Sequence, residues 1–249
     1  MQEWLDDFKT AVAFLTRLPM PHPQGAIPEN FVRAHRMFPA VGALIGAAVG
    51  LICLASRWCG VPDFGAAALA LGASAILTGA LHEDGLADVA DGFGGGRDKE
   101  AKLEIMRDSR LGTYGALILL VSFAAKLSAL AAIPDGHVVP SLIAAHALGR
   151  GVLPAMSLNL PYARKDGLAR NAGQPDVATA AIAGGLALLI ALVSLSWSNA
   201  FYSAVLAGVS GFAIAWLALR QIGGQTGDVL GGAEQVGETG ILLLLAAQP

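Results

Sequence analysis

Long apolar runs separated by short polar segments dominate the chain. Each run is close to the roughly 20 residues that a helix needs to cross a bilayer. The runs cover residues 38–56, 64–81, 111–133, 138–160, 177–197 and 200–219. The pattern predicts an all-α fold, a polytopic transmembrane helical bundle that forms one membrane domain over residues 1–249.

A seventh run, residues 229–247, differs because Glu234 and Glu238 lie inside it. Each charge at the centre of a bilayer costs about 3 kcal/mol on insertion scales. The prediction here is a short or half-buried helix, which gives about six to seven spans in total.

The first residues are predicted to form an amphipathic helix that lies in the membrane interface and ends before Pro19. Apolar side chains recur there at three- and four-residue steps: Trp4, Leu5, Phe8, Ala11, Val12 and Leu15. Acidic residues stand where a signal peptide would be positively charged, so we interpret the segment as retained. The Pro-rich stretch 19–30 is then a loop.

Composition supports a membrane protein. Hydrophobic residues make up 55% of the 249 positions and charged residues only 14%, against about 25% charged in soluble proteins. The net charge of −3 gives no reason to expect nucleic-acid binding, which usually leaves a basic surface. Cys53 and Cys59 are interpreted as packing residues.

The positions of Lys and Arg predict the orientation, because positive residues in short loops stay on the cytoplasmic side. With the N-terminus inside, the inner segments hold most of the 16 Lys and Arg residues: Lys9, Arg17, Arg33, Arg36, Arg97, Lys99, Lys102, Arg107, Arg110, Arg164, Lys165, Arg170 and Arg220. The polar segments 82–110, 159–176 and 220–228 then share the cytoplasmic side, where we expect the active site. A bacterial inner membrane is the expected location.

The segment "LHEDGLADVADGFGGG" follows the second apolar run. If that helix continues past Leu81, Asp84, Asp88 and Asp91 fall at i, i+4 and i+7, within roughly 60° of one face. Converging carboxylates repel one another, and a hard cation such as Mg²⁺ relieves that repulsion while keeping positions open for phosphates. The alternative is a solvated acidic face, but no Lys or Arg occurs from Leu81 to Gly96.

Basic residues follow directly, from Arg97 to Arg110. Carboxylates for a metal beside guanidinium groups suit phosphate transfer, because both neutralise a phosphate chain. We expect Arg107 and Arg110 to bind phosphate and Asp108 to accept a proton. Anchoring at the membrane interface is the alternative for all three.

Other charged positions lie within or between the runs. His146 and Arg150 are one helical turn apart inside a span, and a substrate-facing role is preferred over a structural ion pair because a buried Arg needs compensation. Arg164, with Lys165, either binds substrate or only sets the topology. Lys126 is interpreted as structural or snorkelling.

The C-terminal motif "GGQTGD" predicts a nonhelical break lined by protein or water. Asp228 at its end is expected to be a further metal ligand. Glu234 and Glu238 either join the site or pair with Arg150 or Lys126, and the sequence leaves both alternatives open.

Six blocks together resemble the cobalamin synthase family, the adenosylcobinamide-GDP ribazoletransferases. They are "FLTRLP", "FPAVGALIG", "HEDGLADVADG", "IMRDSRLGTYG", "PYARKDGLA" and "GGQTGDVLGGAEQVGE", in order along nearly the whole chain. The resemblance implies a Mg²⁺-dependent transferase of a substituted phosphate group. It would join adenosylcobinamide-GDP to α-ribazole or its 5'-phosphate and release GMP. Our own interpretation of the residues places Asp84 among the catalytic residues.

Three alternatives are weaker. The pattern of CDP-alcohol phosphotransferases starts to match at "DVADG" but fails at Gly95 and Gly96, where Ala and Arg should stand. An ion-coupled transporter would bury its acids at the midplane and often shows inverted repeats. A structural scaffold leaves the intramembrane charges unexplained. The oligomeric state stays open, a homo-oligomer included.

Overall fold

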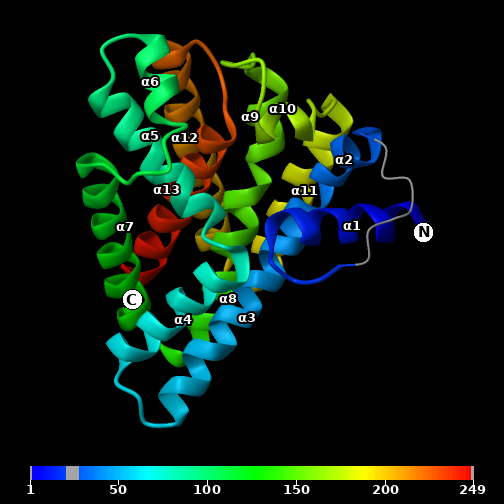
Figure 1. Cartoon of the computed structure of the whole chain (residues 1–249). Coiled ribbons are helices and arrows are strands. Elements are labelled where there is room, and N and C mark those ends of the chain that lie inside the picture. Colours follow the sequence, from blue (N-terminus) through cyan, green and yellow to red (C-terminus); the bar gives the residue numbers. More distant parts are fainter. Residues whose placement is uncertain (1, 21–27, 248–249) are drawn as a thin grey trace.

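The chain folds as a bundle of helices in the computed structural model, which describes residues 2–20 and 28–247 (Figure 1). The long helices are α3 (Phe38–Trp58), α7 (Thr113–Ala132), α8 (Asp135–Gly151), α11 (Val177–Ser194), α12 (Trp197–Ile222) and α13 (Gly227–Ala246). The others are α1 (Gln2–Leu15), α2 (Pro28–Ala34), η1 (His35–Met37), α4 (Asp63–Thr78), α5 (Leu81–Gly95), α6 (Lys99–Ile105), α9 (Leu153–Asn159) and α10 (Leu168–Ala172). No strand occurs among the described residues, so the all-α prediction is confirmed.

Six helical stretches within the described residues are long and apolar enough to cross a membrane: Phe31–Trp58, Thr113–Ala132, Asp135–Asn159, Val177–Ser194, Trp197–Ile222 and Gly227–Ala246. The predicted multi-pass bundle is confirmed, but its members differ from the prediction. The run 229–247 belongs to a complete helix of 20 residues, α13, and is not a short one. The run 64–81 does not cross by itself, because α4 ends at Thr78.

A sharp bend separates α4 from α5, so the prediction that the second helix continues past Leu81 is wrong. Gly79 (φ 68°) and Ala80 (φ 55°) are left-handed, and the two helices meet at 91°. A left-handed Ala costs about 1–2 kcal/mol, which tertiary contacts must offset. One of them is the hydrogen bond from the Arg17 backbone N–H to the Leu77 carbonyl, 2.7 Å. By length and composition, α4 and α5 together form either a broken span or a re-entrant loop.

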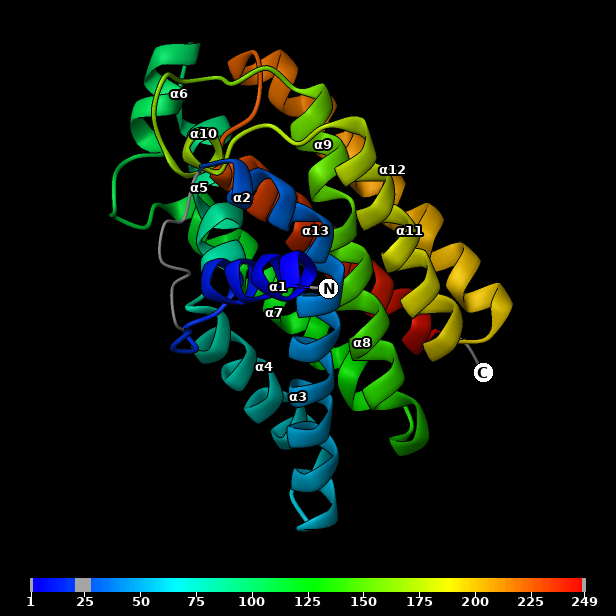
Figure 2. The same cartoon turned by 90° about the vertical axis from the view of Figure 1, so that its right-hand side faces the viewer.

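Glycines bring α3 directly onto α8, and the two helices lie side by side in Figure 2. A Cβ at Gly42 would lie 2.4 Å from the His146 carbonyl oxygen, and one at Gly46 would lie 2.3 Å from that of Leu142. Small residues at four-residue spacing allow this close approach in membrane helices. The contact fixes the part of α8 that carries His146 and Arg150.

The three polar segments predicted to share one side meet at one end of the bundle, the upper end in Figure 1. Backbone hydrogen bonds join two of them: Ala163 N–H donates to the Gln225 carbonyl at 2.9 Å, and Gln225 N–H donates to the Pro161 carbonyl at 2.8 Å. An ion pair between Arg107 and Asp166 attaches the third. The predicted break at "GGQTGD" is also confirmed, since α12 ends at Ile222 and α13 begins at Gly227.

The N-terminal segment is helical as predicted, but it ends at Leu15 rather than near Pro19. Helix α1 lies across α3 in Figure 2 and buries Ala11, Val12 and Leu15 against the bundle. Trp4 and Leu5 stay exposed. The predicted Pro-rich loop 19–30 lies largely outside the described residues.

Candidate functional site

Contact between α5 and α13 brings together three aspartates. A Cβ at Gly85 of α5 would lie 2.8 Å from the backbone oxygen of Asp228, so the helices touch at this point. Asp84 and Asp228 line the same cavity. Asp88 is half-buried, and its charge is repelled by Asp84 and Asp228. We call Asp84, Asp88 and Asp228 the aspartate cluster.

The aspartate cluster carries more negative charge than its protein partners neutralise. Arg164 donates to Asp228 at 3.2 Å, and the Thr226 hydroxyl donates to the same oxygen at 3.1 Å. The side chains of Asp84 and Asp88 make no hydrogen bond or ion pair within the described part of the chain. Three carboxylates therefore face one guanidinium, and the arrangement favours an additional cation.

Asp91 has a different environment from the other two aspartates of α5. Its side chain is buried, and its two oxygens accept hydrogen bonds from the backbone N–H groups of Gly112 and Gly115, both at 2.8 Å. Gly112 is the N-cap residue of α7 and Gly115 lies in its first turn, where helices leave backbone donors without partners. The structure thus gives Asp91 a capping role at α7, which distinguishes it from Asp84 and Asp88.

The residues that remain fit a hard divalent cation. Mg²⁺ takes oxygen ligands, uses one or two carboxylates and keeps several waters or phosphates. Asp84 and Asp88 come from one helix and Asp228 from another, and neither of the first two has a competing partner among the described residues. Asp84, Asp88 and Asp228 would hold the ion.

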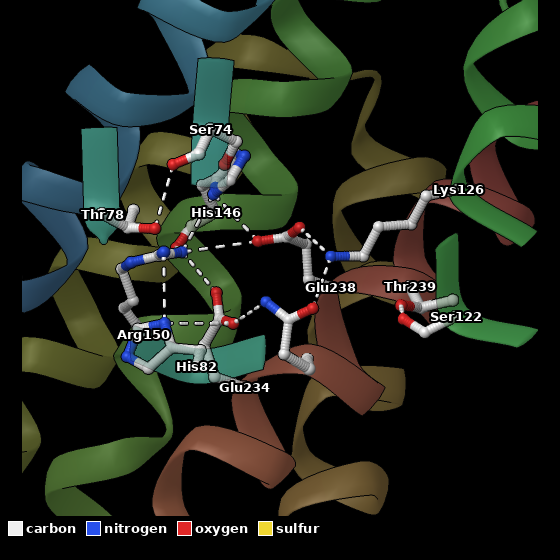
Figure 3. A network of polar contacts seen from close by, with 11 residues as sticks. Ser74, Thr78, His82, Ser122, Lys126, His146, Arg150, Glu234, Glu238 and Thr239 are labelled. Atoms are coloured by element: carbon white, nitrogen blue, oxygen red, sulfur yellow. Dashed lines mark hydrogen bonds and ion pairs between the residues drawn. The ribbon is translucent and has the colours of Figure 1, made fainter. Parts of the chain in front are cut away.

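A second group of charges lies deeper, between α5, α7, α8 and α13, and we call it the buried ion network (Figure 3). The Arg150 guanidinium is 1% exposed and donates to Glu234. It also contacts Nδ1 of His146 at 2.9 Å and Nδ1 of His82 at 3.3 Å. Arg150 therefore has partners on three helices.

The other half of the buried ion network is centred on Glu238. One of its oxygens accepts from Lys126 Nζ at 2.6 Å, and the other lies 2.9 Å from His146 Nδ1. Lys126 also donates to the Gln235 side chain at 2.7 Å. Two cationic residues face two glutamates here, so the charges of the network are balanced within the protein.

These contacts correct one prediction and decide two others. Arg150 and His146 were preferred as substrate-facing residues, but both are buried and bonded to protein partners. Glu234 and Glu238 pair with Arg150 and Lys126, the alternative that the sequence left open. The structural interpretation of Lys126 is confirmed.

The same network contains three described residues whose side chains could act together as metal ligands. Ligand atoms of His146, Glu234 and Glu238 all lie within 4.8 Å of one another. Arg150 and Lys126 already supply the positive charge at these atoms. The positive charge that an added cation would bring is therefore already present at these atoms.

The segment before α7 carries the other predicted phosphate ligands. Arg107 pairs with Asp166, and the Arg110 Nε donates to both oxygens of Asp108 at 3.0 Å. Hydrogen bonds from Arg110 hold the pKa of the Asp108 carboxyl at about 2. A carboxylate this acidic is a weak base near neutral pH, which argues against Asp108 as the proton acceptor.

An ion pair and an aromatic cluster near the N-terminus escaped the sequence analysis. Asp7 is 0% exposed and lies 2.6 Å from Arg36 Nη2. Its position on the apolar face of α1, one turn before Ala11, was the available signal. The rings of Phe14, His35 and Phe38 stack beside it and line the cavity of the aspartate cluster.

Comparisons with known proteins agree on one family. Residues 7–246 match the sequence profile described as cobalamin-5-phosphate synthase. The adenosylcobinamide-GDP ribazoletransferase of Bradyrhizobium diazoefficiens is 46% identical over 97% of this chain and 93% of its own length. Proteins of the same name from Sinorhizobium medicae (42% identical, 99% and 98% covered) and Mesorhizobium japonicum (43%, 96% and 92%) are also similar. No solved structure matches the chain.

Proposed function

The chain belongs to the cobalamin-5-phosphate synthase family, and on this premise we propose that it transfers a phosphocobinamide group. The donor is adenosylcobinamide-GDP, the substrate named in its relatives. The acceptor is the ribose of α-ribazole or of α-ribazole 5'-phosphate, and GMP leaves. The proposal is supported by the aspartate cluster, whose negative charge is only partly neutralised by the protein. The cluster lies at the end of the bundle where Arg164 also lies.

The reaction is a displacement at phosphorus. A ribose hydroxyl oxygen forms a bond to the phosphorus that carries the cobinamide group, and the bond from this phosphorus to the bridging oxygen breaks. The electron pair leaves with GMP, and the hydroxyl proton must pass to a base. Positioning and charge neutralisation dominate the catalysis of such transfers.

The side chains supply both effects. Arg164 neutralises phosphate oxygens, because its guanidinium provides donors in a fixed fork, and its bond to Asp228 (3.2 Å) orients it. Asp84, exposed at the cavity, is our candidate to orient the acceptor hydroxyl and accept its proton. Asp84, Asp88 and Asp228 would hold Mg²⁺, which neutralises the pyrophosphate and the leaving GMP when it is bound.

Exposed arginines nearby have a secondary role. Arg107 and Arg110 are held by Asp166 and Asp108, and exposed pairs of this kind contribute little to stability. Either arginine is therefore free to exchange its carboxylate for a substrate phosphate. We assign them to attracting the donor rather than to the chemical step.

We further propose a bacterial inner-membrane location with a cytoplasmic N-terminus. The support is the excess of Lys and Arg in the segments that meet at the polar end, because such residues stay on the cytoplasmic side. Nucleotide substrates are cytoplasmic, so the aspartate cluster then faces their source. Labelling of single cysteines introduced in the segments 97–110 and 195–197 would test this orientation.

The decisive experiment measures GMP release from adenosylcobinamide-GDP by purified protein with and without α-ribazole. We expect release that depends on the acceptor and yields a product in which the ribose is esterified. Absence of product with both α-ribazole and its 5'-phosphate, in ample Mg²⁺, would refute the proposed function.

A further inference from the structure

The backbones of α5 and α13 touch at two points beside the aspartate cluster. A Cβ at Gly85 of α5 would lie 2.8 Å from the carbonyl oxygen of Asp228, and a Cβ at Gly231 of α13 would lie 3.2 Å from the Cα of His82. Small residues let membrane helices approach this closely. The aspartate cluster draws two members from α5 and one from α13, so the distance between these helices sets the spacing of its carboxylates.

A side-chain contact joins the same two helices (Figure 3). His82 Nδ1, at the start of α5, lies 3.3 Å from Glu234 Oε2 of α13 and 3.3 Å from Arg150 Nη2 of α8. The His82 side chain is buried, and the Arg150 guanidinium holds Glu234 in place from the other side. Helix α5 is therefore tied to α13 by a side chain as well as by its backbone.

The cavity of the aspartate cluster is small. Its volume is about 80 Å³, and Asp84 and Asp228 line it together with His82 and Gly231. A space of this size holds a few water molecules, which suits a hydrated ion better than a whole substrate. Its width depends on how closely α5 and α13 approach each other.

We propose that the α5–α13 contact, made by His82, Gly85, Gly231 and Glu234, selects Mg²⁺ over larger cations by fixing the distance between the carboxylates of the aspartate cluster. Mg²⁺ needs near-ideal geometry with bonds of about 2.0–2.1 Å, whereas Ca²⁺ accepts about 2.3–2.6 Å and looser arrangements. A close and fixed contact between the two helices favours the smaller ion. The four residues act through the aspartates and are positioning residues.

This inference rests on the proposed function, in which the aspartate cluster holds Mg²⁺. It adds the residues that determine which ion the cluster prefers.

Two neighbouring glycines of α13 give the sharpest test. Gly231→Ala places a methyl group 3.2 Å from the Cα of His82, which is tighter than ordinary contacts, so α5 and α13 must separate slightly. We expect the dissociation constant for Mg²⁺ to rise by about tenfold, as when other residues that orient metal ligands are replaced. The constant for Ca²⁺ should change much less.

Gly232→Ala is the matched control. Gly232 is also buried in α13, and both substitutions raise the helix propensity equally. Its added Cβ would lie 3.6 Å from the nearest atom, Val89 Cγ2, which is an ordinary van der Waals distance. Both dissociation constants should stay at their wild-type values.

The side-chain contact is tested at His82. His82→Leu removes the contact with Glu234 and should lower the affinity for Mg²⁺ more than that for Ca²⁺. His82→Asn keeps a polar group near the position of Nδ1 and should restore most of the preference. Lys126→Met controls for general loss of stability, because it breaks the ion pair with Glu238 and should lower the melting temperature while the preference for Mg²⁺ is kept.

Metal binding is measured without turnover. Electron paramagnetic resonance follows free Mn²⁺ as the purified protein in detergent binds it, and Mg²⁺ or Ca²⁺ is added as the competitor. An unchanged ratio of the Mg²⁺ and Ca²⁺ affinities in Gly231→Ala and His82→Leu would overturn the inference. Equal losses for both ions would also overturn it, because they would show damage to the cluster without any effect on the choice of ion. If His82→Leu does not fold, the glycine variants and His82→Asn decide the outcome.

The same measurement separates this inference from the proposed function. Wild type that prefers Mg²⁺, loses the preference in Gly231→Ala and releases no GMP would refute the transfer and support the role of the contact. Wild type that releases GMP, with the preference unaffected by these variants, would refute the role of the contact alone. Wild type that binds no divalent cation would refute both the Mg²⁺ assignment and the inference.

Discussion

Helix α13 carries carboxylates of two kinds. Glu234 and Glu238 lie deep in the bundle and are paired with Arg150 and Lys126. Asp228, in the first turn of the same helix, joins Asp84 and Asp88 in a cluster that has only Arg164 as a cationic partner among the described residues. One group is balanced by the protein, and the other is not.

Depth in the bundle explains the difference. A charge buried in a membrane protein persists only with a compensating partner, so the deep glutamates must be neutralised by the chain itself. The aspartate cluster lies at the polar end, where Asp84 is exposed and water reduces the cost of excess charge. The excess negative charge there favours binding of a cation.

Removal of divalent cations should have the largest effect. With excess EDTA we expect GMP release to stop, and Mg²⁺ or Mn²⁺ to restore it. Ca²⁺ should restore it poorly, because it prefers longer bonds and looser geometry. Full turnover in EDTA would remove the functional distinction between the two groups of carboxylates.

Substitutions in the aspartate cluster should abolish activity without loss of stability. Asp84→Asn and Asp88→Asn each remove one charge from a set that repels itself, so the melting temperature of the apo protein should hold or rise. Turnover should fall by roughly 10²-fold or more, comparable with the loss of one electrostatic group in other active sites. Active but unstable variants would make the cluster structural.

Substitution in the buried ion network should instead lower stability and leave substrate binding unchanged. Arg150→Met leaves Glu234 buried without its partner, and breaking a buried pair in this way costs about 3–5 kcal/mol. We expect a clear drop in the free energy of unfolding in detergent, with the KM for both substrates preserved in the folded fraction. The double variant Arg150→Met with Glu234→Met should recover much of the stability. Unchanged stability of the single variant, with weakened substrate binding, would return Arg150 to the substrate site.

Asp91 belongs to neither group and should behave as a cap. Asp91→Ala leaves two backbone donors of α7 without acceptors, at a cost of about 1–3 kcal/mol for each buried group. Activity at low temperature should exceed that of Asp84→Asn. The control is Asp98→Ala, which removes the exposed cap of α6, a 2.9 Å bond to Ala101 N–H, and should cost about 1 kcal/mol. Activity as low as that of Asp84→Asn, with normal stability, would make Asp91 a metal ligand after all.

The smallest effect is expected at Asp108. Its pKa of about 2 lies below the usual value for Asp, so the carboxylate stays ionised throughout the range from about pH 5 to about pH 9. Asp108→Asn should therefore leave the shape of the pH–rate profile unchanged in that range and reduce kcat only slightly. Loss of a basic limb from the profile would identify Asp108 as the proton acceptor.

The sequence by itself determined the all-α membrane fold, most helix positions and the segments that share the polar end. This information is local in the sequence. The apolar runs predict the helices, and the acidic residues of α5 can be recognised without knowing which other residues contact them. The family resemblance also rested on blocks that are contiguous in sequence. Asp84 and Asp88 were found on these grounds, as one helical face of α5.

Only the tertiary structure decided which charges are satisfied. Whether Arg150 faces a substrate or Glu234 depends on how α8 packs against α13, 84 positions away in sequence. The cap of α7 by Asp91 and the bend at Gly79 and Ala80 depend in the same way on neighbouring helices. The sequence does not show whether a charged residue is paired, because the free-energy cost of the charge in a membrane depends on the partner that folding places beside it.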